Sequence, residues 1–111
     1  MRAKFLLSLV LALALICIFL PAAKAQGLVT VQGQVVNAKS QPIPGVSVSL
    51  LYPNGRQRSS LSITDSFGNY KIYGVPTNPQ PYFIEVYWGK QLLYRQPIRV
   101  VAPMNYFIRI R

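Results

Sequence analysis

Apolar and polar residues alternate along most of the chain beyond residue 27, with the period of two that is typical of half-buried β-strands. Residues 28–36 alternate valine with threonine and glutamine. Residues 46–52 alternate valine and leucine with Ser47 and Ser49, which should face solvent. Residues 82–88 carry the clearest alternation, with tyrosine, isoleucine, valine and tryptophan on one face. No period of 3.6 residues is present here, so the pattern predicts an all-β domain.

Turn-forming residues divide this part of the chain into short strands. Glycine, proline and asparagine recur at about the 8–12-residue spacing of a β-sandwich, which predicts about seven strands in an antiparallel, Greek-key-like sandwich. Residues 76–81 contain three prolines and should form a rigid loop, whereas Gly89-Lys90 should form a two-residue hairpin turn. The expected strands cover residues 28–36, 46–52, 61–63, 70–75, 82–88, 91–95, 98–101 and 105–111, the last with Tyr106, Ile108 and Ile110 facing inward.

The segment from Thr64 to Tyr70 joins two of these strands and has the composition of a hairpin loop. Asp65 can accept hydrogen bonds from the backbone N–H groups of the turn, and Gly68 can supply the positive φ that closes it. The alternative interpretation is that Asp65 and Asn69 are ligands of a calcium-binding loop. Calcium prefers several carboxylates, and here there is one, so the turn is the favoured interpretation.

Two motifs in this order resemble the carboxypeptidase regulatory-like domain, a transthyretin-type sandwich. They are the segment from Pro42 to Val48, preceded by a strand with Gly33 and Val35, and the segment from Thr64 to Pro76. The resemblance covers residues 31–88 and extends loosely to the C-terminal strands. It implies an accessory domain without catalytic residues, of the kind found beside metallocarboxypeptidases or at the N-terminus of outer-membrane transporters. The residues that it implies shape the fold are Gly33, Gly45, Asp65, Gly68 and Tyr70.

The first residues have the pattern of a secretory signal peptide. Arg2 and Lys4 precede an uncharged run at residues 5–20, and Ala23 and Ala25 stand where a signal peptidase reads small side chains. We therefore expect residues 1–25 to form a cleaved signal helix and residues 26–111 to form the β-sandwich domain. The processed protein should be periplasmic or secreted and should have no membrane span.

Two other fates of the N-terminal segment are disfavoured. An uncleaved anchor needs about 20 apolar residues, and this run is shorter. A lipid anchor on Cys17 needs a small residue before the cysteine, where this chain has Ile16. Nothing follows the domain in this chain, so we expect its partner to be a separate molecule.

The processed chain lacks the residues of most active sites. Its 86 residues contain no histidine and no cysteine, which excludes a Ser/His/Asp triad and a zinc site of the usual type. Its carboxylates are Asp65, which has a turn to form, and Glu85, which points away from the apolar face of its strand. We therefore expect no enzymatic activity, no metal and no cofactor.

The charge balance favours an acidic partner. The chain carries 12 basic and 2 acidic residues, a net charge of +10, and loss of Arg2, Lys4 and Lys24 leaves +7. Such a surplus attracts lipopolysaccharide, lipid head groups or acidic glycans, with nucleic acid less favoured. The basic residues are scattered singly, however, which is also typical of charge that serves solubility.

These observations lead to three functional hypotheses. The first is a non-enzymatic docking module for an envelope protein, by strand addition or surface complementarity. The second is a binder of anionic glycan, lipopolysaccharide or lipid through a basic, aromatic-edged face, and the third is a transthyretin-like carrier or hydrolase. Tyr82 and Trp88 are expected in the core, whereas Tyr87 and Tyr94 should be exposed. The candidate binding surface comprises Lys71, Tyr87, Lys90, Tyr94, Arg95, Arg99, Arg109 and Arg111.

Overall fold

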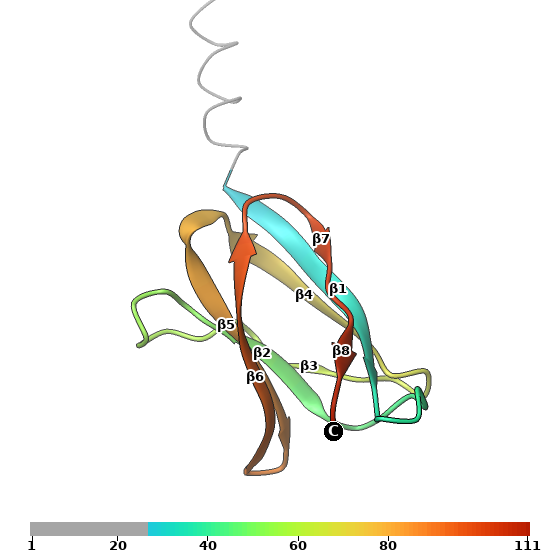
Figure 1. The fold of residues 1–111 in the computed structure, drawn as a ribbon. Coiled ribbons are helices and arrows are strands. Elements are labelled where there is room, and N and C mark those ends of the chain that lie inside the picture. The colour runs from blue at the N-terminus through green and yellow to red at the C-terminus, as the bar shows by residue number, and fades with distance from the viewer. Residues whose placement is uncertain (1–26) are drawn as a thin grey trace, which may run out of the picture.

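A computed structural model describes residues 27–111, so the predicted signal peptide and its cleavage site at Ala23 and Ala25 lie outside the described residues. Strands and turns make up the described part, and no helix in it is long and apolar enough to cross a membrane. The strands form two sheets that pack face to face (Figure 1). The predicted all-β sandwich is therefore confirmed.

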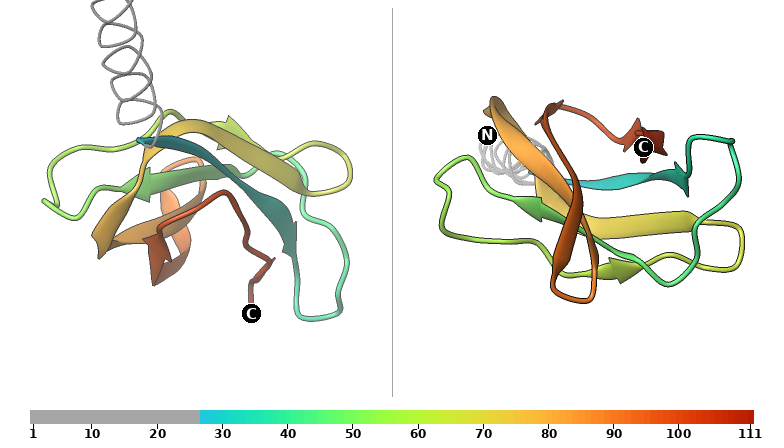
Figure 2. Two further views of the ribbon diagram at one scale, coloured as in Figure 1. Left: turned by 90° about the horizontal axis from the view of Figure 1, so that it is seen from above. Right: turned by 60° about the horizontal axis from the view of Figure 1, so that its bottom comes forward.

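The first sheet has the order β4-β1-β7, with β8 also paired to β1, and the second sheet has the order β3-β2-β5-β6. Figure 2 shows the two layers from other directions, with the C-terminal segment beside β1. The strands are β1 (Leu28–Val36), β2 (Ser47–Leu51), β3 (Ser62–Ile63), β4 (Asn69–Pro76), β5 (Asn78–Trp88), β6 (Gln91–Val100), β7 (Met104–Asn105) and β8 (Ile108–Arg109).

The core lies between the two sheets and is built by alternation. Successive side chains of a strand point to opposite faces, so every second residue of β1, β2, β4 and β5 meets the opposite sheet. Because residues 27–111 contain no cysteine, this apolar interface must hold the described part together without an internal disulfide. The buried cluster comprises Val31, Val35, Val46, Val48, Leu50, Tyr70, Ile72, Val75, Tyr82, Ile84, Val86, Ile98, Val100 and Ile108.

The loop before β4 has the predicted turn chemistry. Asp65 Oδ1 accepts hydrogen bonds from the backbone N–H groups of Phe67 and Asn69, both at 2.9 Å. Gly68 adopts φ +75°, and its carbonyl oxygen accepts a 2.8 Å hydrogen bond from the Val35 N–H. The loop is therefore an Asx-type turn that is also tied to the end of β1.

Two predicted breaks in the second sheet are absent. The proline-rich segment at residues 76–81 is not a loop, because β5 begins at Asn78 and only Thr77 separates it from β4. Similarly, the strands predicted at residues 91–95 and 98–101 are one strand, β6, which passes through Pro97 and ends at Val100. Edge strands and bulges tolerate proline because the missing N–H costs no ladder hydrogen bond there. β6 is an edge strand, and the register of β5 shifts between Asn78 and Tyr82.

The C-terminal strand differs in direction from the antiparallel prediction. Residues 105–111 form parts of β7 and β8, which both run parallel to β1. The direction follows from the route of the chain, which crosses from β6 to the first sheet and then follows β1 from Val31 toward Val36. Side-chain alternation does not encode that route. The inward placement of Ile108 is confirmed, and Tyr106 and Ile110 pack against the core.

Trp88 is not a core residue, contrary to the prediction. It continues the alternation of Ile84 and Val86, but 57% of it is exposed. β5 ends at Trp88, and the ring lies over Gly45 rather than in the core. Alternation gives the face of a residue but not the point at which the strand ends.

Gly68 and Gly74 offer a matched test of the turn. Both have positive φ, at 75° and 65°, but a Cβ on Gly68 would lie 2.5 Å from the Val35 carbonyl oxygen. At Gly74 no atom of residues 27–111 would lie within 4 Å of it. We expect Gly74→Ala to lower the free energy of unfolding by about 1 kcal/mol through backbone strain alone. Gly68→Ala should cost about 1–3 kcal/mol more through the steric conflict. Urea unfolding at neutral pH measures both, and equal losses would contradict this account of the turn.

Candidate functional site

The outer face of the second sheet carries a buried carboxylate. Glu85 lies on the face of β5 opposite to Ile84 and Val86, as its place in the alternation predicts, yet only 1% of it is exposed. The Arg58 guanidinium donates to Glu85 Oε1, and Arg95 Nε lies 3.6 Å from Oε2. The hydrogen bond to Glu85 raises the pKa of Arg58. The carboxylate is thus enclosed and neutralised by two cations.

Each of these arginines also lies over an aromatic ring. The guanidinium carbon of Arg95 is 4.7 Å from the ring centroid of Phe83, and that of Arg58 is 6.0 Å from the centroid of Tyr87. Phe83, Glu85 and Tyr87 are successive outward residues of β5, so one strand supplies both rings and the carboxylate. About half of each arginine side chain, 46%, remains exposed. We call these five residues the arginine platform.

The loop between β2 and β3 brings Arg58 to this face. The side-chain oxygen of Asn54 accepts a 2.9 Å hydrogen bond from the Arg56 N–H and tightens the turn. Ser59 then forms two hydrogen bonds with Leu50, both at 2.8 Å. The Ser59 N–H donates to the Leu50 carbonyl oxygen, and the Ser59 Oγ accepts from the Leu50 N–H. The loop projects to the left in Figure 1, and these bonds return it to the side of β2. Arg58 is therefore fixed by backbone contacts as well as by Glu85.

Ser49 lies beneath this platform and was expected to face solvent. It is on the outer face of β2, but it is 1% exposed because its cross-strand neighbour is Glu85, under the two arginines. Its Oγ has no hydrogen-bond partner among the described residues. Apolar side chains flank the platform in register, namely Leu92 opposite Tyr87, and Leu51 and Pro97 on either side of Phe83.

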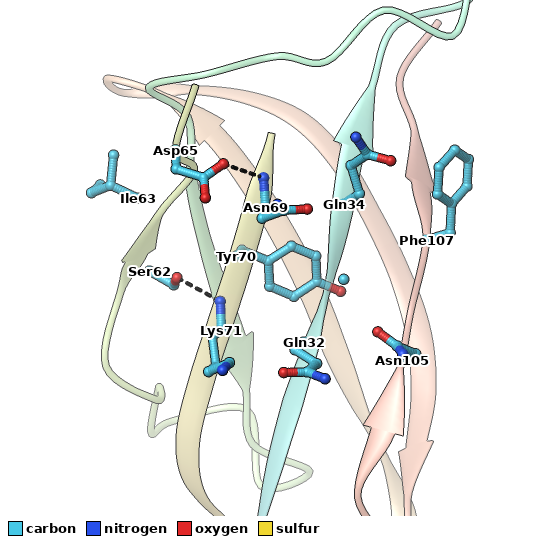
Figure 3. A pocket seen from close by; sticks show the side chains of 11 residues that line it. Gln32, Gln34, Ser62, Ile63, Asp65, Asn69, Tyr70, Lys71, Asn105 and Phe107 are labelled. Atoms are coloured by element: carbon cyan, nitrogen blue, oxygen red, sulfur yellow. Dashed lines mark hydrogen bonds between the residues drawn. The ribbon is translucent and has the colours of Figure 1, made fainter. Parts of the chain in front are cut away.

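A second candidate surface is a groove on the outer face of the first sheet (Figure 3). Outward side chains of β1, β4 and β7 form its floor, β3 and the Asp65 turn form one wall, and the segment after β7 forms the other. It consists of two adjoining hollows of about 750 and 350 Å³, which share three lining residues. We call it the amide groove, and its floor residues are Gln32, Gln34, Asn69, Lys71 and Asn105.

Strand register aligns the floor of the amide groove. Gln32 is paired with Lys71 on β4 and with Asn105 on β7, so these three side chains form a row across the sheet. Both hollows share this row. Gln34 and Asn69 form the next row, and the Gln34 amide donates a 2.8 Å hydrogen bond to a loop carbonyl oxygen. The polar half of the β1 alternation thus becomes a concave polar surface.

Three tyrosines connect the sheets. The Tyr70 hydroxyl donates to the Tyr106 carbonyl oxygen at 2.6 Å, and the hydroxyls of Tyr106 and Tyr94 are 2.8 Å apart. Tyr94, predicted to be exposed and available to a ligand, is half-buried and packs against the core. The prediction missed this because the register of β6 shifts between the positions opposite Val86 and Tyr87 and turns Tyr94 inward. Burial, with the hydrogen bond to Tyr106, raises the pKa of Tyr94 to about 12, and burial also raises that of Tyr70.

The other predicted surface residues are exposed, except Tyr87, which is half-buried, and they are not gathered into one face. Tyr87 and Arg95 meet in the arginine platform, and Lys71 lies in the amide groove. The rest are dispersed, with Lys90 in the β5–β6 turn, Arg99 near the end of β6, Arg109 on β8 with Nη1 3.3 Å from the Ala38 carbonyl oxygen, and Arg111 at the last position.

Sequence reasoning missed most of both surfaces. Arg58 gave no signal because it lies in a loop whose path depends on tertiary contacts. Glu85 gave one, since an acidic residue amid apolar strand positions needs cationic partners. The polar face of β1, with Gln32 and Gln34, was the sequence signal for the amide groove. The depth of the groove, however, depends on the C-terminal segment with Asn105, which gave no such signal.

No family model and no curated protein sequence matches the chain. Solved structures with a similar fold include GBS52, the minor pilin of Streptococcus agalactiae, with TM-score 0.57 and 16% identity over 77% of this chain and 44% of that one. The Bacillus anthracis TIE protein has TM-score 0.55 and 10% identity over 76% of this chain and 16% of that one. A Cyanothece 9R-lipoxygenase has TM-score 0.52 and 14% identity over 75% of this chain and 16% of that one. This chain spans less than half of each structure, and the likeness shows the fold alone.

Tyr94 leads to a prediction for alkaline solution. An unfolded tyrosine ionises near pH 10, whereas Tyr94 in the folded protein ionises near 12. Between these values the unfolded chain binds fewer protons than the folded one, so the free energy of unfolding falls as pH rises. Tyr94→Phe should reduce this fall. Urea unfolding at about pH 9 and about pH 11 compares the two proteins, and an identical fall in both would show that Tyr94 does not contribute.

Proposed function

We propose that this protein is an exported, non-enzymatic docking module, related to carboxypeptidase regulatory-like domains, that binds an acidic surface of a separate envelope protein. The signal-peptide pattern of residues 1–25 supports export to the periplasm or the cell exterior. The order of the Pro42–Val48 and Thr64–Pro76 motifs and the sandwich fold support the family assignment. A non-enzymatic role is supported by the carboxylates, because Asp65 holds a turn and Glu85 is closed off by arginines.

The observation that carries this proposal is the arginine platform. Arginine and tyrosine are enriched among the residues that dominate the energy of protein interfaces. Here Arg58 and Arg95 are already positioned by Glu85 and by the rings beneath them, so little side-chain entropy is lost when a partner binds. The apolar flank at Leu92, which is 44% exposed, adds the kind of surface that a partner can desolvate.

Charge defines the partner. Two guanidinium groups share one carboxylate, so the arginine platform keeps a net positive charge and N–H groups that face solvent. A carboxylate on the partner would accept from them with the geometry of a charge-assisted hydrogen bond. An acidic protein surface with an apolar centre therefore complements this face.

Docking by this face is favoured over strand addition at the sheet edge. β6 presents a long free edge, but Pro97 interrupts its N–H groups and Arg95 and Arg99 flank it. Proline and charge on an edge strand disfavour pairing with another chain. These features oppose main-chain pairing at the edge and leave the outer face of the sheet available for side-chain contacts.

Anionic glycan, lipopolysaccharide or a lipid head group is the second candidate, favoured by the exposed basic residues outside the arginine platform. Dissolved ions would screen the contacts between these basic residues and an anionic ligand, so binding should weaken steeply as salt rises from about 50 to about 200 mM. Exchanging Arg109 and Arg111 for glutamate should abolish such binding. Binding by a protein should tolerate both changes.

In-cell photo-crosslinking tests the docking function. A benzophenone amino acid at Leu92 should give a protein adduct, whereas one at Val101, an exposed apolar residue outside the platform, should not. Arg95→Ala should reduce the Leu92 adduct about tenfold or more, since it removes a guanidinium while Arg58 still neutralises Glu85.

Arg99→Ala is the matched control, because it removes the same charge from the same strand at an exposed position outside the platform. Its adduct should equal that of the parent. Equal adducts from Leu92 and Val101, or equal losses for the two arginine variants, would rule out docking by the arginine platform.

A further inference from the structure

The amide groove takes no part in the proposed docking function and lies on the other sheet. Its floor is unusual for the outer face of a β-sheet, because four of its five side chains are carboxamides. A carboxamide offers two donors and an acceptor on one rigid group. Four of them in one hollow present both kinds of hydrogen-bonding group to whatever enters (Figure 3).

Most of this hydrogen-bonding capacity is unused within residues 27–111. The side chains of Gln32, Asn69 and Asn105 form no hydrogen bond to other described residues, and Gln34 uses its amide N–H toward the Phe67 carbonyl oxygen. Gln32 is also partly buried, at the centre of the row that the two hollows share. A ligand in the groove would therefore meet donors and acceptors that need not be released from other protein groups.

The amide groove is close to electrically balanced in a strongly basic protein. Lys71 on the floor and Asp65 on the wall are its two charged lining residues. Asp65 uses Oδ1 in the turn and retains its other oxygen, and Lys71 lies 5.7 Å from the ring centroid of Tyr73. This balance favours a ligand that is polar but uncharged.

Exposed aromatic rings stand on both sides of the floor. Tyr73, on β4, lines the smaller hollow and is 67% exposed, and Phe107, in the C-terminal segment, lines the larger one and is 53% exposed. Large exposed rings beside free amides suit a ligand with both an apolar face and a polar rim.

The central strand beneath the amide groove, β1, has no free edge for an extended peptide. β1 is paired with β4 on one side and with β7 and β8 on the other. At the groove the outward N–H of Lys71 on β4 donates to Ser62 Oγ at 2.9 Å. Main-chain pairing provides most of the affinity in strand addition, and a peptide lying along β1 would lack it.

From these observations we infer that the amide groove binds an uncharged oligosaccharide. Sugar hydroxyls both donate and accept, which matches Gln32, Asn69 and Asn105, and the C–H face of a pyranose ring can pack on Tyr73 or Phe107. The elongated shape, made of two joined hollows, suits a chain of several sugars. The ligand class thus follows from free amides, charge balance and flanking rings together.

Titration of the ¹⁵N-labelled domain with maltotetraose, cellotetraose and chitotetraose tests this inference. At about 10 mM, at least one of these neutral tetrasaccharides should shift the side-chain amide resonances of Gln32 and Asn105. Gln32→Ala and Asn105→Ala should each weaken that binding about tenfold, the equivalent of one lost hydrogen bond.

Gln96→Ala is the matched control, because Gln96 is an exposed amide on β6 in the other sheet, and it should bind like the parent. Leu92→Lys should also bind like the parent, which separates this inference from the docking function. The inference fails if none of the three sugars shifts the groove resonances. It also fails if tetragalacturonate alone does so, or if Gln32→Ala binds as well as Gln96→Ala.

Discussion

The contact of Gly33 with the Tyr106 carbonyl group is the constraint on which the rest of the structure depends. A Cβ on Gly33 would lie 1.9 Å from the Tyr106 oxygen, so the strand and the C-terminal segment approach closely only because this position has no side chain. The same oxygen accepts a hydrogen bond from Tyr70, and the Tyr106 N–H donates to Gln32. The C-terminal segment is thus fixed on β1, and its two short parallel strands complete the sheet.

This contact also determines the shape of the amide groove. Asn105 and Phe107 stand immediately before and after Tyr106, so their positions on the floor and on the wall of the groove follow from where Tyr106 is held. Tyr94 reaches the same residue from the second sheet through its hydroxyl. One residue therefore links both sheets to the segment that makes a flat sheet face concave.

The sequence allowed most of the fold to be predicted because the local signals agreed with the tertiary structure. Alternation identified the inward residues of β1, β2, β4 and β5, and Asp65 and Gly68 identified their turn. The errors share one kind of cause, which is tertiary. The exposure of Trp88, the burial of Tyr94 and the direction of β7 and β8 depend on where β5 ends, on a register shift and on a crossover. Of the candidate sites, Tyr87, Arg95 and Lys71 were found, but Arg58 and Asn105 come from a loop and from the chain end, whose paths alternation does not encode.

The two candidate surfaces face opposite directions, because the inner faces of the sheets are joined by the core. A ligand on one surface should therefore leave the other unchanged unless an element belongs to both. β3 is such an element, since its two residues pair with Ser47 and Val48 in the second sheet, while Ser62 binds the Lys71 N–H and Ile63 lines the amide groove. A two-residue strand has few bonds to resist displacement. β3 therefore offers energetic coupling between the amide groove and the arginine platform a second route besides the Tyr94–Tyr106 hydrogen bond. Along this route Ile63, Ser47, Tyr87 and Leu92 form one row across the sheet.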